Sequence, residues 1–312
     1  MSVQVSQAIV NQLFTDAKMT LLNAAKEYTP QFSGLYSVEK SQGEQSVYPV
    51  LAVSAAMNRL SGSPAYHDLF LKALTITNGK PWVDFISIQR ERIEKQSSMT
   101  YLDQVAATHG VAAKALEDDL ILTLLQNGTA TTWGPDGKAF FATDHPNSPN
   151  GVVSGTWSNL HTGTALTAAN FETVLQNLMA RVGWNGRAMN FRGGFELIVP
   201  PQLRSTAKRI CEQEMSSDPG VATAGGNTNI NKDAAKVRVC QLLSGEPTVW
   251  YLAAVGEIVK PFVVQEWAPL EMTWQTSPDN DAVFEQEEYR AKVRRGVEGG
   301  HLDPHYISRC AA

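Results

Sequence analysis

The sequence predicts a mixed α+β fold, and three features of the chain favour it. Residues 99–128 have the apolar period of one long helix, and residues 69–92 and 262–297 are rich in the β-branched and aromatic residues typical of strands. Residues 195–255 alternate between strand and helix patterns, which indicates a mixed domain. A chain of 312 residues has room for about two domains, or for one elongated body with excursions.

The long helix is the element around which the other segments are arranged. Its apolar residues recur at three- and four-residue steps, whereas its charged residues fall mostly elsewhere on the helical wheel. The apolar residues are Leu102, Val105, Ala106, Ala113, Leu116, Leu120 and Leu124, and the charged ones are Asp103, Lys114, Glu117 and Asp118. At about 1.5 Å per residue the helix is about 40 Å long, which exceeds what a compact core can bury on all sides. We therefore expect the charged residues to face outward.

Two glycines punctuate this helix. Gly128 follows the last periodic residue, where a left-handed glycine often ends a helix. Gly110 lies inside the helix and costs about 1 kcal/mol relative to alanine, so we expect close packing or a slight bend there.

The N-terminal segment predicts a second helix over residues 5–27, which the Thr29-Pro30 pair ends because the residue before proline avoids helical geometry. Residues 31–44 show no periodicity and indicate an extended arm. Such a terminal helix either docks on its own core or makes contacts outside its own domain, and the sequence leaves both open.

Residues 69–77 and 82–89 form the clearest strand signal, and they flank Asn78-Gly79, the dipeptide preferred in tight type I′ hairpins. Residues 46–53 are a further short strand candidate. A charged cluster follows the second strand and comprises Arg90, Glu91, Arg92, Glu94 and Lys95. A long isolated hairpin is marginally stable and exposes strand edges, so either the protein's own sheet or another copy of the chain must cover it.

The remaining chain continues the mixed pattern. Residues 129–163 are rich in turn formers with a short strand at 139–142, and a helix capped by Thr167 follows and runs to Gly183. Further expected elements are strands at 195–199, 236–242, 248–255, 262–267, 270–276 and 283–297, a helix at 202–215 and a surface loop at 216–233.

Composition excludes several classes of protein. The net charge of −5 and pI near 5.7 argue against a nucleic-acid binder that relies on a basic surface. The three cysteines, Cys211, Cys240 and Cys310, form no CxxC pair, which favours reduced thiols in a cytoplasmic compartment. The N-terminus has no secretory pattern, and no apolar run approaches the roughly 20 residues that cross a bilayer.

Candidate catalytic residues are few. Asp144-His145-Pro146 resembles an acid/base pair, but it lies among turn formers without a nucleophile at a telling spacing, which favours a turn with a hydrogen-bonded histidine. His301, Asp303 and His305 alternate as metal ligands on one strand face could, but Pro304 interrupts the strand.

Other charged groups also favour structural roles. The sequence 134–138 lacks the spacing of a phosphate loop, and the pairs Asp118-Asp119 and Glu287-Glu288 face apart as solvated charges. Lys292, Arg294 and Arg295 could meet phosphates, although a solvated strand face or salt bridges between subunits suit them better. No catalytic, cofactor-binding or metal-binding residue is therefore assigned, which favours a building block or a binding module over an enzyme.

Four short segments resemble a known family. They are FATDHP at 141–146, LIVPP at 197–201, WYL at 250–252 with KPF at 260–262, and SPDNDAVF at 277–284 with EY at 288–289. Together with the order of arm, hairpin, charged segment and long helix, they resemble the major head subunits of Mu-like tailed phages, which have the HK97-type fold. Residues 301–312 depart from this pattern because they lack an aromatic-rich tail.

The resemblance implies a division of the chain. Residues 1–57 would be an N-terminal arm, 58–96 an extended hairpin loop over a neighbour, and 97–191 a peripheral domain with the long helix as its spine. Residues 192–268 would be the axial domain, and 269–312 would return to the peripheral domain as strands.

The resemblance also implies a function. The chain would self-assemble, as hexamers and pentamers, into an icosahedral virion shell that encloses packaged double-stranded DNA, which it contacts non-specifically. A separate scaffolding protein, a portal and optionally a cementing protein would be partners, with assembly in the host cytoplasm and no membrane. Interface candidates are Asn78, Gly79, Trp82, Arg90, Glu91, Arg92 and Glu94. The alternatives are an encapsulin-like nanocompartment shell, or an enzyme that uses His145 or the His301/His305 pair.

Overall fold

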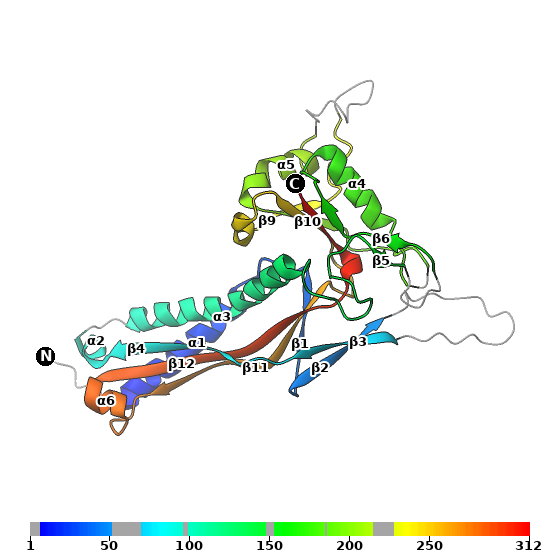
Figure 1. Cartoon of the computed structure of the whole chain (residues 1–312). Coiled ribbons are helices and arrows are strands. Elements are labelled where there is room, and N and C mark those ends of the chain that lie inside the picture. The colour runs from blue at the N-terminus through cyan, green and yellow to red at the C-terminus, as the bar shows by residue number, and fades with distance from the viewer. Residues whose placement is uncertain (1–6, 52–69, 96–98, 148–152, 185, 215–227) are drawn as a thin grey trace.

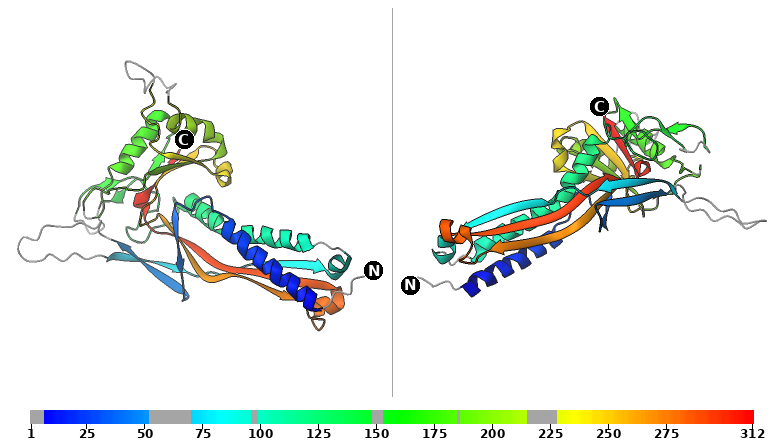
Figure 2. Two further views of the ribbon diagram at one scale, coloured as in Figure 1. Left: turned by 180° about the vertical axis from the view of Figure 1, so that it is seen from behind. Right: turned by 60° about the horizontal axis from the view of Figure 1, so that its bottom comes forward.

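Two main sheets organise the protein in the computed structural model, which describes residues 7–51, 70–95, 99–147, 153–184, 186–214 and 228–312 (Figure 1). The first sheet is long and narrow and is accompanied by two long helices, and we call this part the long body. The second sheet lies with two shorter helices near one end of the first, and we call this part the short body (Figure 2). The sequence prediction of a mixed helix and sheet fold is confirmed.

The long body contains a sheet in the order β1-β11-β12-β4, in which β1 and β11 are parallel and the other neighbours antiparallel. Its strands are β1 (Tyr36–Lys40), β4 (Trp82–Gln89), β11 (Phe262–Gln275) and β12 (Glu288–His301). Helices α1 (Gln7–Glu27) and α3 (Met99–Asn127) pack against each other and against one face of this sheet. Phe14 and Leu21 of α1 are fully buried there, so the N-terminal helix docks on its own core.

The long helix α3 is confirmed, and its two glycines are explained by close packing. A Cβ atom at Gly110 would lie 2.2 Å from the Leu21 carbonyl oxygen of α1, so only glycine allows the two helices to approach this closely. A Cβ at Gly128 would lie 2.6 Å from the ring of Phe141. The expectation of a left-handed Gly128 was wrong, because its φ is not positive.

The short body contains a sheet in the order β7-β13-β10-β8-β9, with helices α4 (Ala168–Met179) and α5 (Arg204–Cys211). Its strands are β7 (Leu160–Thr162), β8 (Phe195–Val199), β9 (Lys236–Val239), β10 (Val249–Ala254) and β13 (Ile307–Ala311). The predicted cap of α4 is confirmed, since the Thr167 hydroxyl accepts from the Asn170 N–H at 3.2 Å. Strand β13 pairs with β10 and β7, so the last strand does not return to the long body as expected for 269–312.

The predicted hairpin around Asn78-Gly79 was wrong. Both strands exist, but β3 (Phe70–Thr77) pairs with β2 (Gln45–Leu51), whereas β4 pairs with β12. Gly79 has no positive φ, and a Cβ there would lie 2.7 Å from a carboxylate oxygen of Glu298. An Asn-Gly pair makes a hairpin only where its flanking strands prefer each other, and here each strand has another partner. The connection of β2 to β3, residues 52–69, lies outside the described residues.

Several other segments also differ from their predicted conformation. The expected arm at 31–44 contains strand β1, and the charged cluster after β4 forms helix α2 (Arg90–Lys95). Residues 262–276 form one strand rather than two, and the start of the expected strand at 283–297 is helix α6 (Asp281–Gln286). Residues 139–142 form no strand beyond a single bridge between Thr132 and Ala139. Most of the expected loop at 216–233 lies outside the described residues.

Short elements complete the described chain. They are the paired strands β5 (His145–Pro146) and β6 (Thr156–Trp157), and the 3₁₀ helices η1 (Pro201–Leu203), η2 (Gln241–Gly245) and η3 (Pro304–Tyr306). Cys211, Cys240 and Cys310 are buried free thiols.

Candidate subunit interface

Strand β4 is an edge of the long body's sheet and carries apolar side chains that the subunit leaves exposed. Trp82 and Val83 are each 47% exposed, and Phe85 is 74% exposed. An exposed apolar edge strand is a template for association with another chain, and natural proteins usually protect such edges. Of the sequence-predicted interface residues, Trp82 therefore lies on a surface with the properties of a contact site.

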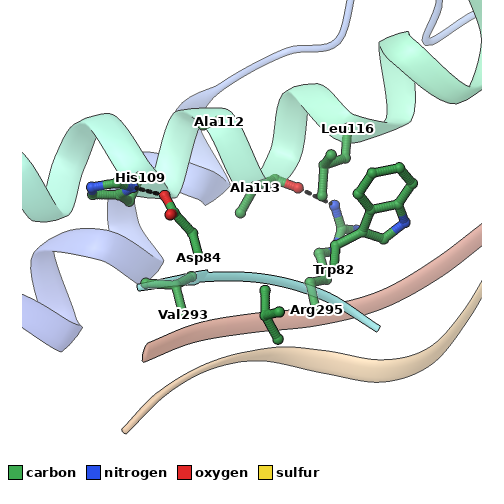
Figure 3. Close-up of a pocket in the computed structure, with 9 residues that line it drawn as sticks. Trp82, Asp84, His109, Ala112, Ala113, Leu116, Val293 and Arg295 are labelled. Atoms are coloured by element: carbon green, nitrogen blue, oxygen red, sulfur yellow. Dashed lines mark hydrogen bonds and ion pairs between the residues drawn. The ribbon is translucent and has the colours of Figure 1, made fainter. Parts of the chain in front are cut away.

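A groove of about 190 Å³ separates β4 from α3, and Trp82, Asp84, His109 and Leu116 are among its lining residues (Figure 3). Asp84 closes part of it, because one carboxylate oxygen lies 2.9 Å from His109 Nδ1 and the other accepts the backbone N–H of Phe85 at 2.9 Å. That N–H of the edge strand is therefore occupied within the subunit.

The charged cluster predicted at the interface lies at the far end of the long body, where α2 and α6 are neighbours (Figure 1). The backbone N–H of Arg90 donates to the Glu287 carbonyl at 2.8 Å and thereby joins the two short helices. Glu91 and Arg92 are exposed on α2, whereas the side chain of Glu94 lies outside the described part of the structure. The cluster is thus a terminal surface of the subunit.

Asn78 and Gly79 lie at the junction between β3 and β4, with polar contacts inside the chain. The Asn78 amide donates to Ser41 Oγ at 2.9 Å and to the Gly43 carbonyl at 2.5 Å, and its oxygen accepts from Gln265 at 2.6 Å. Gly79 leaves room for the carboxylate of Glu298. Both residues hold the start of β4 against β11 and β12.

The long body contains a buried ionic network that the sequence analysis did not predict. Glu117 on α3 is fully buried and accepts from Arg295 Nη2 at 2.6 Å, from Lys114 Nζ at 2.6 Å and from the Tyr36 hydroxyl at 2.5 Å. Arg295 also lies 3.1 Å from Glu266 and donates to the Ala113 carbonyl at 2.8 Å. Burial would raise the pKa of Glu117, but the hydrogen bonds from Lys114, Tyr36 and Arg295 outweigh it and hold that pKa below its ordinary value.

The neighbouring carboxylate, Asp118, fixes the segment that follows α1. Its oxygens accept the backbone N–H groups of Gln31 and Phe32, each at 3.0 Å, and the Tyr28 hydroxyl at 3.0 Å. Burial and this bond to Asp118 raise the pKa of Tyr28 to about 12. The Gln31 carbonyl and side chain also accept from Arg238 and Cys240 of the short body, so this segment joins both bodies to the long helix.

The expectation that the charged residues of α3 face outward was therefore wrong for Glu117 and Asp118. The fully buried residues include Glu117, Ile121 and Leu125, spaced at four, so a carboxylate occupies a position of the apolar stripe. This burial was not predictable locally, because Arg295, the partner of Glu117, lies 178 residues away. Asp119, by contrast, is exposed as expected.

The histidines considered for catalysis or metal binding make bonds within the chain. His145 is buried, with Nδ1 2.5 Å from Asp136 and Nε2 3.2 Å from Asn159, as expected for a turn histidine. His301 Nε2 lies 3.0 Å from the Leu124 carbonyl, and His305 Nδ1 lies 2.7 Å from Asp303. Among the described residues, no three histidine, cysteine or acidic side chains converge as metal ligands.

Two basic residues of β12, Arg294 and Arg295, also have partners inside the subunit. Arg294 lies 2.9 Å from Glu271 and Arg295 belongs to the network of Glu117. The salt bridges expected between subunits for these two arginines are thus formed within one subunit. No helix in the described ranges is long and apolar enough for a membrane span.

A comparison with protein families decides the identity. A family described as the Mu-like prophage major head subunit gpT matches residues 10–165, 157–243 and 228–302, which together cover most of the chain. The chain belongs to this family. It is a shell-forming major capsid protein and a component of the virion capsid. The encapsulin-like alternative has less support, because the matching family is a phage head subunit. No curated protein sequence matches the chain significantly.

Solved structures show the same fold for this head subunit. A chain in the procapsid of bacteriophage JBD30 matches 99% of this chain over 76% of its own length, with 20% identity and a TM-score of 0.63. The mature capsid of bacteriophage PhiM1 matches 91% of this chain and 87% of its own, with 13% identity and a TM-score of 0.53. A chain in a virus-like particle from Pyrococcus furiosus matches 95% of this chain over 98% of its own length, with 11% identity and a TM-score of 0.51. The HK97-type capsid fold is thereby established.

Proposed function

We propose that this head subunit encloses packaged double-stranded DNA, and that neighbouring copies join through the β4 edge and the terminal surface formed by α2 and α6. The observation that carries the proposal is the exposure of Trp82, Val83 and Phe85 on an edge strand of the subunit. Arg92 and Glu91 at the terminal surface supply charges that can fix the register between copies. The chain has no catalytic role in this proposal.

The first partners in this proposal are other copies of the same chain. Many modest contacts between identical subunits close by symmetry, and we propose hexamers and pentamers as the repeating units. A separate scaffolding protein, a portal and optionally a cementing protein complete the head, with assembly in the host cytoplasm. The net charge of −5 suits a container whose DNA, contacted non-specifically, must enter and leave.

The division of the chain is proposed in a form that respects the two bodies. The long body, with α3 as its spine, corresponds to the peripheral domain, and the short body corresponds to the axial domain together with strand β13. The paired strands β2 and β3 belong to the extended loop. The N-terminal arm lies within residues 1–57. On this proposal, Asn78 and Gly79 support the base of the loop rather than its tip.

The central experiment is assembly of the purified protein, alone and with a scaffolding protein, followed by electron microscopy and nuclease protection of enclosed DNA. Closed shells that contain DNA after packaging are expected. A strictly monomeric protein under all conditions would remove the proposal, and shells filled with an enzyme cargo would favour the nanocompartment alternative.

The terminal surface has its own test. Arg92→Glu, which reverses an exposed charge of α2, should reduce shell yield at least tenfold while the thermal unfolding midpoint stays unchanged. Arg204→Glu, on the exposed side of α5 in the short body, is the matched charge reversal. If both variants assemble as the wild type does, the terminal surface is not a contact.

A further inference from the structure

Two exposed phenylalanines stand out among those whose side chains the structure describes. Phe85 on β4 is 74% exposed and Phe284 on α6 is 82% exposed, whereas the other described phenylalanines are buried or half-buried. An exposed aromatic ring forgoes the stabilisation that burial would give, so both rings are expected to become covered in an assembly. Their surroundings differ in charge, and that difference indicates how they are covered.

Phe85 lies on the face of the long body's sheet that α1 and α3 leave open. Residues of antiparallel strands that stand opposite each other share a face, and Phe85 stands opposite Lys292, with Val83 opposite Arg294 and Ser87 opposite Arg290. The helix-facing partners are instead Tyr289, Ala291 and Val293, which are buried. The open face thus presents a column of three cations beside the apolar side chains of Val83 and Phe85.

The cations on this face are unequally compensated within the subunit. Arg294 is paired with Glu271 at 2.9 Å, and Arg290 lies 3.8 Å from Glu288. Lys292, the central member, has neither an ion pair nor a side-chain hydrogen bond with any residue that the structure describes. The positive charge next to Phe85 therefore has no counterion in the described chain.

Phe284 has the opposite surroundings. It projects from α6 between Asp281 and Glu285, both exposed, and the exposed Glu287 follows directly after the helix. Val283 and Ala282 are buried and anchor this helix to the long body, so the ring and the carboxylates stand on a fixed support. We call Asp281, Phe284 and Glu285 the acidic knob.

We propose that the acidic knob of one copy packs on the open sheet face of a second copy, with Phe284 against Phe85 and Val83, and with Asp281 and Glu285 facing Arg290 and Lys292. The inference rests on the proposed shell function and names a contact within it. Aromatic pairing adds stabilisation beyond burial, and charge complementarity fixes the register.

The kind of contact also follows. Because the knob and the open face are different surfaces of one subunit, the contact is head-to-tail, and repetition must close into a ring or propagate. In a shell, rings of long-body ends would result. A DNA strand on the same face would neutralise Lys292 but would leave Phe284 exposed, so a second copy accounts for more of the surface.

Cross-linking tests the contact directly. Shells are assembled from an equal mixture of Phe85→Cys and Phe284→Cys subunits and oxidised with copper phenanthroline, and the native cysteines are silent because they are buried. Disulfide-linked dimers should form in the mixture, and subunits with both substitutions should give larger ladders. Phe284→Cys subunits that cross-link to each other, with no dimer specific to the mixture, would overturn the proposal.

Charge exchange supplies an independent test. Lys292→Glu and Glu285→Lys should each reduce shell yield at least tenfold, and the double variant should recover at least half of the wild-type yield. Lys40→Glu, an exposed lysine on the opposite edge of the sheet, is the control. If wild-type shells form but all variants assemble equally, this contact is wrong and the shell function stands. If the wild type forms no shell, the shell function itself fails.

Discussion

The two sheets differ in how many of their faces the subunit covers. Every residue of β10, at the centre of the short body, is buried, with Trp250 and Leu252 packed on the side of α4 and α5 and with Tyr251 and Ala253 on the other side. The long body's sheet has one face buried under α1 and α3, while its other face is open around Phe85 and Lys292. A subunit that assembles with its neighbours can leave exposed only the apolar surface that those neighbours cover.

The difference teaches where stability and assembly reside. A sheet buried on both faces contributes to folding of the isolated subunit, whereas an open face contributes only after association. The bonds of Gln31 to Asp118, Arg238 and Cys240 fix the two bodies to each other. Substitutions in the two sheets should therefore separate folding from shell formation.

The largest expected effect comes from a pair of substitutions in the two sheets. Trp250→Ala should destabilise the subunit by about 3–5 kcal/mol, because it leaves a cavity in a fully buried layer. It also removes the indole N–H that donates to the Thr164 carbonyl at 3.0 Å. Phe85→Ala should change subunit stability by no more than about 0.5 kcal/mol while reducing shell yield. Urea unfolding of unassembled subunits measures the two stability changes. Equal losses of stability would contradict the distinction between the two sheets.

The next effect concerns the buried network beneath α3. Glu117→Ala should destabilise the subunit by about 3–5 kcal/mol, because Arg295 is left in the interior with only Glu266 as counterion. Asp119 lies two positions from Glu117 on α3 but is exposed, so Asp119→Ala is the matched control. It should lower the stability of the subunit by about 0.5 kcal/mol or less. The double substitution Glu117→Leu with Arg295→Met should lose less than either single change. An additive double variant would show that the pair is not coupled.

Periodicity made much of this fold predictable. Long apolar repeats identified α1, α3 and α4, and β-branched runs identified β3, β4 and β8, because these elements bury a face that the local sequence encodes. Pairing was not predictable, since Asn78-Gly79 joins two strands whose partners come from residues 45–51 and 288–301. Nothing local distinguishes such a junction from a hairpin.

The interface surfaces were predictable only in part. Trp82 and the charged cluster were chosen for their place in and after the expected hairpin; the structure leaves Trp82 and Arg92 exposed, and their contact with a neighbouring copy stays a prediction. Glu117 and Asp118 were misplaced because a buried carboxylate depends on distant partners, here Arg295 and the backbone after α1. Phe284 was not identified, because an exposed phenylalanine and a buried one look alike until the fold is known.

A smaller effect is expected where α1 meets α3. Gly110→Ala should gain about 1 kcal/mol of helix propensity but lose about 1–3 kcal/mol from the clash with the Leu21 carbonyl, with a net destabilisation. Hydrogen exchange should increase along α1 and remain unchanged in the short body. Gly245→Ala has open space around the new methyl group and serves as control. A stabilised Gly110→Ala variant would mean that α1 can move aside freely.

The smallest effect is a response of the long body to acid. The pKa of Glu117 is lower in the folded subunit than its ordinary value of 4.5, so the ionised network stabilises the fold above that value and the contribution is lost as pH falls through the folded pKa. Unfolding free energy measured between pH 6 and pH 3 should therefore decline more steeply in the wild type than in Glu117→Gln. Other carboxylates titrate in both proteins, so the difference in slope isolates Glu117. Identical slopes would mean that Glu117 has the same proton affinity folded and unfolded, which is incompatible with its bonds to Arg295 and Lys114.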